Sequence, residues 1–239
     1  MKKDISVSFV LPMYNERENI LKTVDEVRTL AKDITDDYEI IIVDDASTDD
    51  SVKIAGNLAK EDNAVRLFCL NVNTKFGGAF AKGFKEATKD VILYVDSDMP
   101  VSKKDIKASF PLIRDADIVT GYSSVRKGDT PLRKFISGAY NFIVRMLFGL
   151  KVKDVNSGYK IVSRKIIEDI EFISRSPFVD VELFLHIKKK NGRVKQFPLV
   201  FRTRSGGKSY IARFPVILAT FTDMIKVKIH SCVKQKKNL

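Results

Sequence analysis

Residues 91–98, VILYVDSD, join a short apolar run to two acidic residues. Five consecutive apolar residues that include β-branched ones predict a buried strand over 91–95. Upstream of this run, strand-like segments alternate with segments of helical periodicity. The predicted strands are 5–11, 38–43 and 64–70, and the predicted helices are 16–34, 49–60 and 78–89. This alternation is typical of right-handed βαβ units, so we expect an α/β fold with a mainly parallel twisted sheet flanked by helices.

Polar clusters follow three of these strands. They are residues 12–16 (PMYNE), Asp44 with Asp45, and Asp96 with Asp98. In open parallel sheets, ligands bind outside the carboxyl ends of the strands. Pro12 is expected to stop the first strand, and a turn with a helix cap would explain that cluster without any function. Asp49 also fits a helix cap. Adjacent carboxylates repel each other, so Asp44 and Asp45 favour a functional site.

Asp96 and Asp98 are candidate metal ligands. Carboxylates two residues apart at a strand end can converge on one cation, and hard oxygen ligands suit Mg²⁺ or Mn²⁺. No G-x-G-x-x-G motif follows the first strand, which disfavours a dinucleotide-dependent dehydrogenase. We interpret Gly77 and Gly78 as permitting a tight loop near the ligand.

Charge divides the chain into two unequal halves. The net charge is +12, yet residues 1–120 carry a net −5 and residues 121–239 a net +17. The acidic half is suited to a cation, and the basic half to an anionic partner such as a phosphorylated substrate, a membrane surface or nucleic acid. Nucleic acid is disfavoured, because no recognition motif is visible. The two cysteines have no metal-ligand spacing, and we expect no secretory leader and no membrane-spanning helix.

The motifs V-L-P-x-Y-N-E, I-I-V-D-D-x-S-x-D and V-D-S-D resemble, in order and spacing, those of the family 2 glycosyltransferases. The resemblance covers about residues 5–120 and implies the nucleotide-binding GT-A type fold and a hexosyltransferase activity. It also implies that certain residues bind the nucleotide and that others bind the sugar and the metal. The first group is Pro12, Tyr14, Glu16, Asp44 and Asp45, and the second is Asp96 and Asp98.

The second half contains, in this order, the segments 133–137 (RKFIS), 153–160 (KDVNSGYK) and 201–209 (FRTRSGGKS). With this set it is similar to the polyprenyl-phosphate (dolichyl-phosphate) hexose synthases. The resemblance implies a lipid-phosphate site at Arg133 and Ser137 and a donor-diphosphate site at Arg204 and Lys208, with Asp96, Asp98, Arg133 and Arg204 as the catalytic set. The family's arginine after its fifth strand is absent at Ser123, and Arg126 is the expected replacement. The residues Met99-Pro100 depart from the mannose synthases, whereas residues 180–182 resemble the glucosyl relatives, so the sugar stays open.

The implied reaction is inverting, metal-dependent transfer of mannose or glucose from GDP-mannose or UDP-glucose to a polyprenyl or dolichyl phosphate. The product would be a lipid-linked monosaccharide donor for glycosylation. A phosphate acceptor is already anionic and needs no general base, whereas a sugar hydroxyl does. The alternative is therefore a family 2 enzyme with a saccharide or glycan acceptor, in which Asp154, Asp180 or Glu182 serves as the base.

Two apolar, basic-flanked segments, 131–150 and 214–230, predict amphipathic helices. Each is either a core helix or an interfacial helix with its apolar face in the lipid. We expect a catalytic domain over 1–212, divided into a nucleotide-sugar half (1–120) and an acceptor half (121–212), and a basic helix and tail over 213–239. The expected location is cytoplasmic, peripheral at the cytoplasmic face of a membrane.

Overall fold

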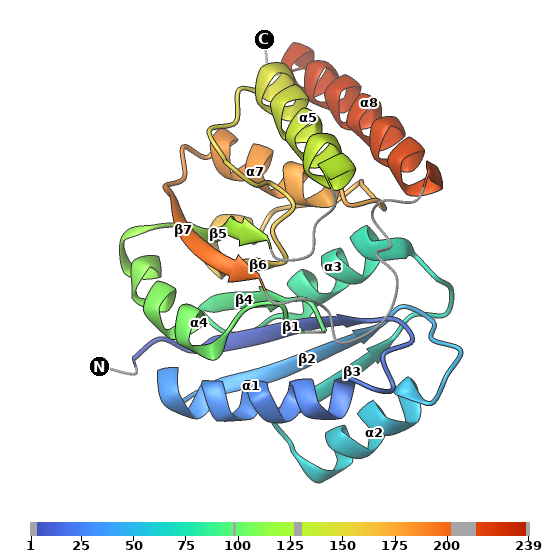
Figure 1. Cartoon of the computed structure of the whole chain (residues 1–239), viewed down its shortest axis with the longest axis vertical. Coiled ribbons are helices and arrows are strands. Elements are labelled where there is room, and N and C mark those ends of the chain that lie inside the picture. Colours follow the sequence, from blue (N-terminus) through green and yellow to red (C-terminus); the bar gives the residue numbers. More distant parts are fainter. Residues whose placement is uncertain (1–3, 98, 127–130, 202–213, 238–239) are drawn as a thin grey trace.

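The computed structural model describes the chain except for residues 1–3, 98, 127–130, 202–213 and 238–239. Its centre is a seven-stranded sheet of order β3-β2-β1-β4-β6-β5-β7 (Figure 1). The strands are β1 (Val7–Met13), β2 (Tyr38–Asp44), β3 (Val65–Cys69), β4 (Val91–Val95), β5 (Ile118–Arg126), β6 (Tyr159–Ser163) and β7 (Val194–Phe201). Strands β1 to β4 pair in parallel, as do β5 and β7, so the predicted mainly parallel sheet is confirmed.

Helices cover both faces of the sheet. They are α1 (Ile20–Ile34), α2 (Ser51–Glu61), α3 (Lys75–Glu86), α4 (Lys103–Ser109), α5 (Pro131–Phe148), α6 (Arg164–Ile167), α7 (Val179–Lys189) and α8 (Phe214–Lys237), with a 3-10 turn at Phe110–Asp115. Figure 1 shows α1 and α2 on one side of the sheet and α3, α5, α7 and α8 on the other. Alternate residues of β1 therefore enter different cores: Phe9 packs with α1, and Val10 packs with α3. Burial on both faces explains why the strands read as continuous apolar runs.

Strand β6 interrupts the parallel order. It runs antiparallel to both β4 and β5, between which it lies. The loop before β6 therefore lies at the carboxyl end of β4, where the backbone N–H of Asp96 donates to the carbonyl oxygen of Gly158 at 3.3 Å. In this way the second half of the chain reaches the edge where the first half ends its strands.

Pro12 does not stop β1, contrary to the sequence prediction. The strand continues to Met13, and Pro12 pairs with Val43 in register. The carbonyl oxygen of Pro12 accepts a hydrogen bond from the Ser97 hydroxyl, on the β4 side of the strand. The missing N–H points to that same side, where the ladder with β4 has already ended at Val10. No ladder bond is lost.

Gly77 and Gly78 lie in the first turn of α3 and not in a loop, which corrects a second prediction. The N–H of Gly77 donates to the carbonyl oxygen of Arg175 at 2.9 Å. A Cβ on Gly77 would lie 2.5 Å from the carbonyl oxygen of Ser174 and 2.8 Å from the backbone of Arg175. Gly77 therefore permits the helix to approach the 173–176 loop closely, whereas a Cβ on Gly78 would overlap the Thr74 side chain.

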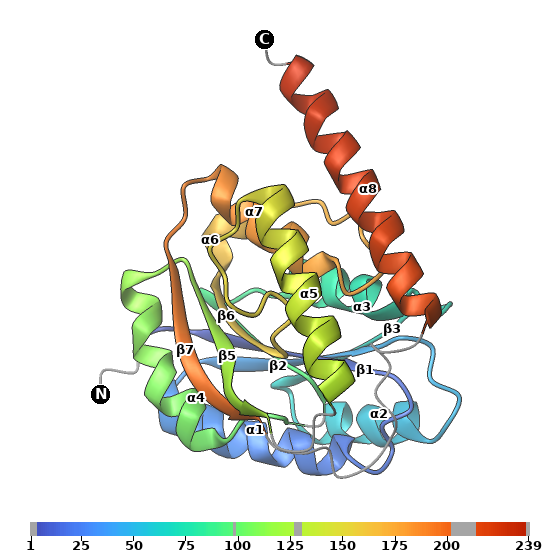
Figure 2. The same ribbon diagram turned by 45° about the horizontal axis from the view of Figure 1, so that its top comes forward.

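Helix α8 is attached to the same loop. The Asp223 carboxylate accepts hydrogen bonds from the backbone N–H groups of Arg175 and Ser176, both at 3.0 Å. Beyond this attachment, α8 projects from the body of the molecule (Figure 2). The Lys228 ammonium donates to the carbonyl oxygen of Leu147 at 3.3 Å, so α8 also contacts the end of α5.

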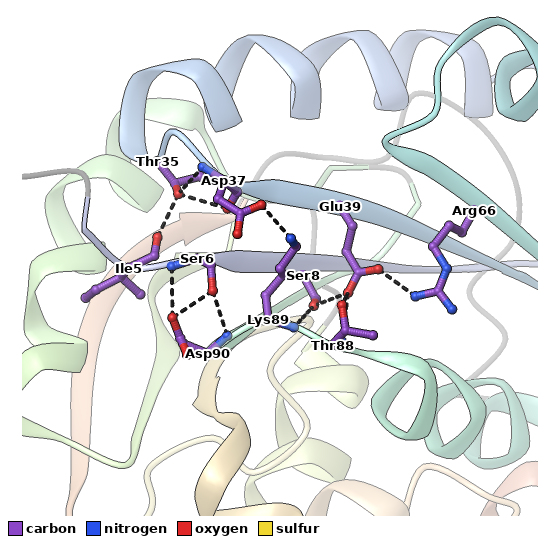
Figure 3. Close-up of polar contacts among 10 residues, drawn as sticks. All are labelled: Ile5, Ser6, Ser8, Thr35, Asp37, Glu39, Arg66, Thr88, Lys89 and Asp90. Carbon is purple, nitrogen blue, oxygen red and sulfur yellow. Dashed lines mark hydrogen bonds and ion pairs between the residues drawn. The ribbon is translucent and has the colours of Figure 1, made fainter.

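At the opposite, amino end of the sheet, a buried network closes the fold (Figure 3). The Glu39 carboxylate accepts from the Ser8 hydroxyl at 2.7 Å, from the Thr88 N–H at 2.7 Å and from Arg66 at 2.6 Å. Burial by itself would raise the pKa of Glu39, but these hydrogen bonds outweigh it and lower the pKa below its ordinary value. This network has a structural role, far along the strands from the acidic clusters.

Candidate active site

The carboxyl edge of the sheet contains unusual backbone conformations. Asn15, Ala46, Lys75 and Met99 have φ values of 56°, 60°, 65° and 44°. Asn15, Ala46 and Met99 lie in the loops that follow β1, β2 and β4, and Lys75 begins α3 after β3. The fifth non-glycine residue with positive φ among those described, Asn191, lies before β7 and is separate from this group. Left-handed conformations cost a non-glycine residue about 1–3 kcal/mol and concentrate at functional sites. Their clustering marks this edge as the candidate active site.

Side chains lock together the loops that follow β1 and β2. The N–H of Asn15 donates to the Ser47 hydroxyl at 2.9 Å, and Asn15 Oδ1 accepts from the N–H of Thr48 at 2.8 Å. The N–H of Glu16 donates to the Ser51 hydroxyl at 2.8 Å. The two loops therefore form one rigid rim beside the sheet.

The predicted helix cap at Asp49 is wrong by one residue, because the N-cap of α2 is Asp50. Asp49 belongs to the same rim and still contacts the start of the helix. Its Oδ1 accepts from the N–H of Ser51, the first residue of α2, at 3.0 Å. A carboxylate at this place satisfies one of the N–H groups that a helix leaves unpaired at its start.

Asp44 and Asp45 differ in their partners although both are buried. Asp44 Oδ2 accepts from the N–H of Ser47 at 3.1 Å, which shapes the turn after β2. Asp45 Oδ1 accepts from the N–H of Thr74 at 2.6 Å and from its hydroxyl at 2.8 Å. Burial raises the pKa of Asp45, and the hydrogen bonds from Thr74 oppose that rise without cancelling it. Asp45 thus ties the end of β2 to the start of α3.

Asp96 follows β4 directly, and protein groups lie on two sides of it. The Tyr94 hydroxyl donates to Asp96 Oδ1 at 2.9 Å. On its other side, a Cβ on Gly158 would overlap Asp96 Oδ2 and come within 3.1 Å of Cγ. A hydrogen-bonded carboxylate in a cradle that leaves no room for another methyl group fits a ligand for a hard divalent cation.

Other groups capable of holding a cation are sparse near Asp96. Among the residues that the structure describes, no three His, Cys, Asp or Glu side chains gather into a metal-binding group. The second predicted ligand, Asp98, lies outside the described residues. The metal role of the pair therefore stays a prediction, supported by the surroundings of Asp96.

The described nucleotide-site candidates share the carboxyl edge. They are Pro12, Tyr14, Glu16, Asp44 and Asp45. The Tyr14 side chain is 47% exposed at the rim. Glu16 is partly buried, and its Oε2 accepts from the Asn19 amide at 2.7 Å.

The predicted anion-binding residues are less fully described. Arg204 and Lys208 lie outside the described residues. Arg126 ends β5 and Arg133 lies in the first turn of α5, but their side chains fall outside the description too. Ser137 is partly buried on α5, and its carbonyl oxygen accepts from the Asn141 amide at 2.9 Å.

The carboxylates that could serve as a general base, Asp154, Asp180 and Glu182, are all buried. Glu182 accepts from the N–H groups of Ile173 and Ser174 at 2.8 and 3.0 Å, one on each oxygen. Asp180 Oδ1 lies 2.9 Å from the Lys160 ammonium. Burial raises the pKa of Asp180 to about 6, and Lys160 opposes that rise. Asp154 is buried as well and adds to the rise through its charge.

Thr74, Tyr94 and Lys160 are parts of the site region that the sequence analysis missed. Thr74 is the N-cap residue of α3, but the sequence analysis predicted that helix over 78–89 and therefore gave no reason to select Thr74. Tyr94 reads as one more apolar residue of a strand. Lys160 reads as a surface lysine, although its side chain is fully buried.

Comparisons with known proteins identify the family of this chain. The family model described as "Glycosyl transferase family 2" matches residues 8–171. Glycosyltransferase AglD of Haloferax volcanii is 30% identical over 220 residues, which cover 87% of this chain and 35% of that protein. The chain thus spans about a third of the length of that relative.

Two further relatives match over most of their length. The undecaprenyl-phosphate mannosyltransferase of Micrococcus luteus is 27% identical, with 84% of this chain and 85% of that protein covered. The dolichyl-phosphate beta-glucosyltransferase ALG5A of Trichomonas vaginalis is 27% identical, with 94% of this chain and 73% of that protein covered.

Solved structures confirm the GT-A type fold. The glucosyl-3-phosphoglycerate synthase from Mycobacterium tuberculosis, in complex with phosphoglyceric acid, superposes with a TM-score of 0.67 at 21% identity and covers 86% of this chain and 74% of its own. A complex of the same synthase with Mn²⁺, UDP and glucosyl-3-phosphoglycerate has a TM-score of 0.66 at 20% identity, with the same coverage of both chains. At this identity the likeness bears on the fold, while the family-model match over residues 8–171 shows the family. The chain belongs to glycosyl transferase family 2.

Proposed function

We propose that this protein transfers a hexose, mannose or glucose, from a nucleotide diphosphate sugar to a polyprenyl or dolichyl phosphate, with inversion and with a divalent cation. The names of the Micrococcus luteus and Trichomonas vaginalis relatives support this acceptor, since both act on polyprenyl-type phosphates. The product would be a lipid-linked monosaccharide.

The observation that carries the lipid acceptor is an apolar surface on α5 and α8. Nine large apolar side chains of these helices are exposed. They are Phe135, Ile136, Phe142, Met146 and Leu147 on α5, and Leu218, Phe221, Ile225 and Ile229 on α8. Phe135 and Met146 reach 74% and 72% exposure. A soluble acceptor gives no reason for such a surface, whereas a substrate with a long hydrocarbon chain does.

The side of α8 that faces away from the protein is apolar. Its exposed apolar residues recur at helical spacing, 218, 221, 225 and 229. A second set, which includes Val216, Met224 and Val227, is buried against the protein. An inner apolar stripe serves the core, and the outer stripe is suited to the acyl boundary of a membrane. We therefore include docking on a membrane surface in the proposal. No helix within the described residues meets the length and hydropathy needed to span a bilayer.

Two of the three candidate bases disfavour the saccharide-acceptor alternative. Glu182 has both oxygens on backbone N–H groups, and Asp180 is paired with Lys160. A general base must reach the proton that it removes, and these two are engaged in the interior. A phosphate acceptor needs cationic positioning instead, which the +17 net charge of residues 121–239 supports.

On the donor side, Asp96 and Asp98 would hold Mg²⁺ or Mn²⁺, which supplies charge stabilisation to the departing diphosphate when bound. The Mn²⁺ and UDP in the solved synthase support a divalent cation of this kind. Pro12, Tyr14, Glu16, Asp44 and Asp45 would bind the nucleoside. Arg204 and Lys208 would hold the donor diphosphate, and Arg126, Arg133 and Ser137 the acceptor phosphate.

The test is transfer of label into lipid. The purified chain is incubated with radiolabelled UDP-glucose or GDP-mannose, Mn²⁺ or Mg²⁺, and undecaprenyl or dolichyl phosphate in detergent. We expect one donor to give label that partitions into organic solvent, and EDTA to abolish it. No lipid label from either donor with either acceptor overturns the proposal.

Two variants separate the acceptor classes. Arg133→Ala should reduce transfer to lipid phosphate strongly, because the variant removes a predicted partner of that phosphate. Asp98→Ala should abolish transfer to any acceptor. If Arg133→Ala leaves lipid transfer at the wild-type rate, the assigned acceptor site is wrong.

A further inference from the structure

Tyr94 holds one side of the Asp96 carboxylate from a fixed position. Its hydroxyl donates to Asp96 Oδ1 at 2.9 Å, and the Tyr94 side chain is fully buried. The ring centroid lies 4.9 Å from that of Phe80, and the rings of Phe76 and Phe84 lie 6.3 and 6.2 Å away. A phenol packed among three aromatic rings has little freedom to move, so its hydroxyl donates to Asp96 from a fixed position.

Gly158 lies on the other side of the same carboxylate. Its carbonyl oxygen accepts from the Asp96 N–H at 3.3 Å, and a Cβ at Gly158 would overlap Asp96 Oδ2. Gly149 is the one described glycine with positive φ, so the backbone at Gly158 does not itself require glycine. The requirement is space, and the group that needs the space is the Asp96 carboxylate.

The segment that carries Gly158 also supports the Tyr94 ring. The Lys160 ammonium lies 5.7 Å from the centroid of that ring. Lys160 also donates to the carbonyl oxygen of Ser157 and pairs with Asp180. Residues 157–160 therefore support both the hydroxyl that contacts Asp96 and the surface beside it.

We propose that Tyr94 and Gly158 are positioning residues that set the orientation of the Asp96 carboxylate toward the divalent cation of the donor. The inference rests on the proposed function for the identity of that cation. A carboxylate held in place before the cation arrives needs no reorganisation on binding, and partners of this kind contribute about 10- to 100-fold to metal affinity.

The experiment measures Mn²⁺ binding without the acceptor. The protein is titrated with Mn²⁺, and electron paramagnetic resonance measures the free Mn²⁺ that remains. UDP and GDP are each tested with the wild type, and the nucleotide that promotes Mn²⁺ binding is then used for the variants. We expect about tenfold weaker Mn²⁺ binding for Tyr94→Phe and for Gly158→Ala. Matched controls remove the same groups elsewhere. Tyr38→Phe changes the amino end of β2, and Gly56→Ala changes α2, where a Cβ would meet one atom of Leu67 at 4.0 Å. Both controls should bind Mn²⁺ like the wild type.

A second arm tests whether the effect passes through Asp96. In an Asp96→Ala background, neither Tyr94→Phe nor Gly158→Ala should weaken Mn²⁺ binding further. Unchanged Mn²⁺ binding in both single variants overturns the inference. The inference is also overturned if Tyr94→Phe and Gly158→Ala weaken Mn²⁺ binding as much in the Asp96→Ala background as in the wild type. If Gly158→Ala fails to fold, Tyr94→Phe decides alone, because it removes a single oxygen atom and keeps the ring.

The outcome is independent of the acceptor. If neither UDP nor GDP promotes Mn²⁺ binding to the wild type, this inference is overturned, whatever the lipid assay gives. Conversely, absence of lipid product with intact Mn²⁺–nucleotide binding would overturn the proposed function and leave the roles of Tyr94 and Gly158 standing.

Discussion

The Lys160 ammonium and the Asp180 carboxylate form an ion pair at 2.9 Å whose side chains are 0% and 2% exposed. The pair joins β6 to α7 beneath the candidate active site. Removing either partner of such a pair leaves the other charge buried without compensation, which costs folding free energy.

Replacing Lys160 by Ala should lower the free energy of unfolding by about 3 kcal/mol, because Asp180 then stays buried without a cation. Urea denaturation followed by circular dichroism at pH 7.5 measures the loss. The double variant Lys160→Met/Asp180→Leu should recover most of it, since it removes both charges and keeps the volume. A double variant less stable than Lys160→Ala would contradict this account.

Glu39 predicts a loss of stability in acid. Its folded pKa lies below the ordinary value of 4.5, so it stabilises the fold above that pH. This contribution should disappear as the pH falls from 4.5 through the lower folded pKa. Glu39→Gln should be less stable than the wild type at pH 7 and should change less between pH 4.5 and pH 3, as measured by urea midpoints. The exposed Glu61 at the end of α2 offers the control Glu61→Gln, which should follow the wild type at every pH.

Thr74→Val should weaken nucleotide binding about fivefold, the loss of roughly 1 kcal/mol for one hydrogen bond. The variant removes the hydroxyl that donates to Asp45 and keeps the backbone N–H. Isothermal titration with UDP or GDP measures the affinity. Thr29→Val on the exposed side of α1 is the matched control. If Thr74→Val binds the nucleotide with wild-type affinity, the proposed role of Asp45 in nucleotide binding is wrong.

The exposed apolar side chains of α5 and α8 predict binding to lipid vesicles. Replacing Phe142 and Ile225 together by Ser should reduce sedimentation with anionic vesicles at least several-fold, because it removes about 2 kcal/mol of transfer free energy per side chain. Leu21→Ser, on the exposed side of α1, should sediment like the wild type. Equal sedimentation of all three proteins would exclude α5 and α8 as the docking surface.

Asp223 predicts how firmly α8 is attached. Asp223→Ala leaves the N–H groups of Arg175 and Ser176 without their acceptor. Hydrogen exchange at these two amides should become at least tenfold faster, while β1 and β4 stay protected. Thr222→Ala, one position earlier on the exposed side of α8, is the control. Unchanged exchange at both amides would show that the Asp223 carboxylate does not hold this attachment.

Local patterns predicted the first half of the fold well. The strand predicted over 91–95 has the bounds of β4, and the other early strands differ by a few residues at their ends. Apolar periodicity carries this information because the strands are buried on both faces and the helices on one. The start of α1 was harder, since residues 16–19 form a turn fixed by contacts with the β2 loop.

The second half depended on partners distant in sequence. Strand β6 is hidden in the sequence because a lysine is its second residue, and that lysine is buried with Asp180 of α7 as its partner. Its antiparallel direction follows from packing between β4 and β5, which no local pattern encodes.

From the sequence alone came the alternation of strands and helices, the acidic residues at three strand ends and the charge difference between the two halves. Those features are local, because burial periodicity and residue chemistry can be read within a few turns of chain. Folding decided which carboxylates are held and by what: Asp45 by Thr74, Asp96 between Tyr94 and Gly158, and Asp180 by Lys160. The contact of Tyr94 with Asp96 lies at the end of one strand. The other three contacts join residues more than 15 positions apart and depend on how the sheet is ordered. They could be found only once the strands were placed side by side.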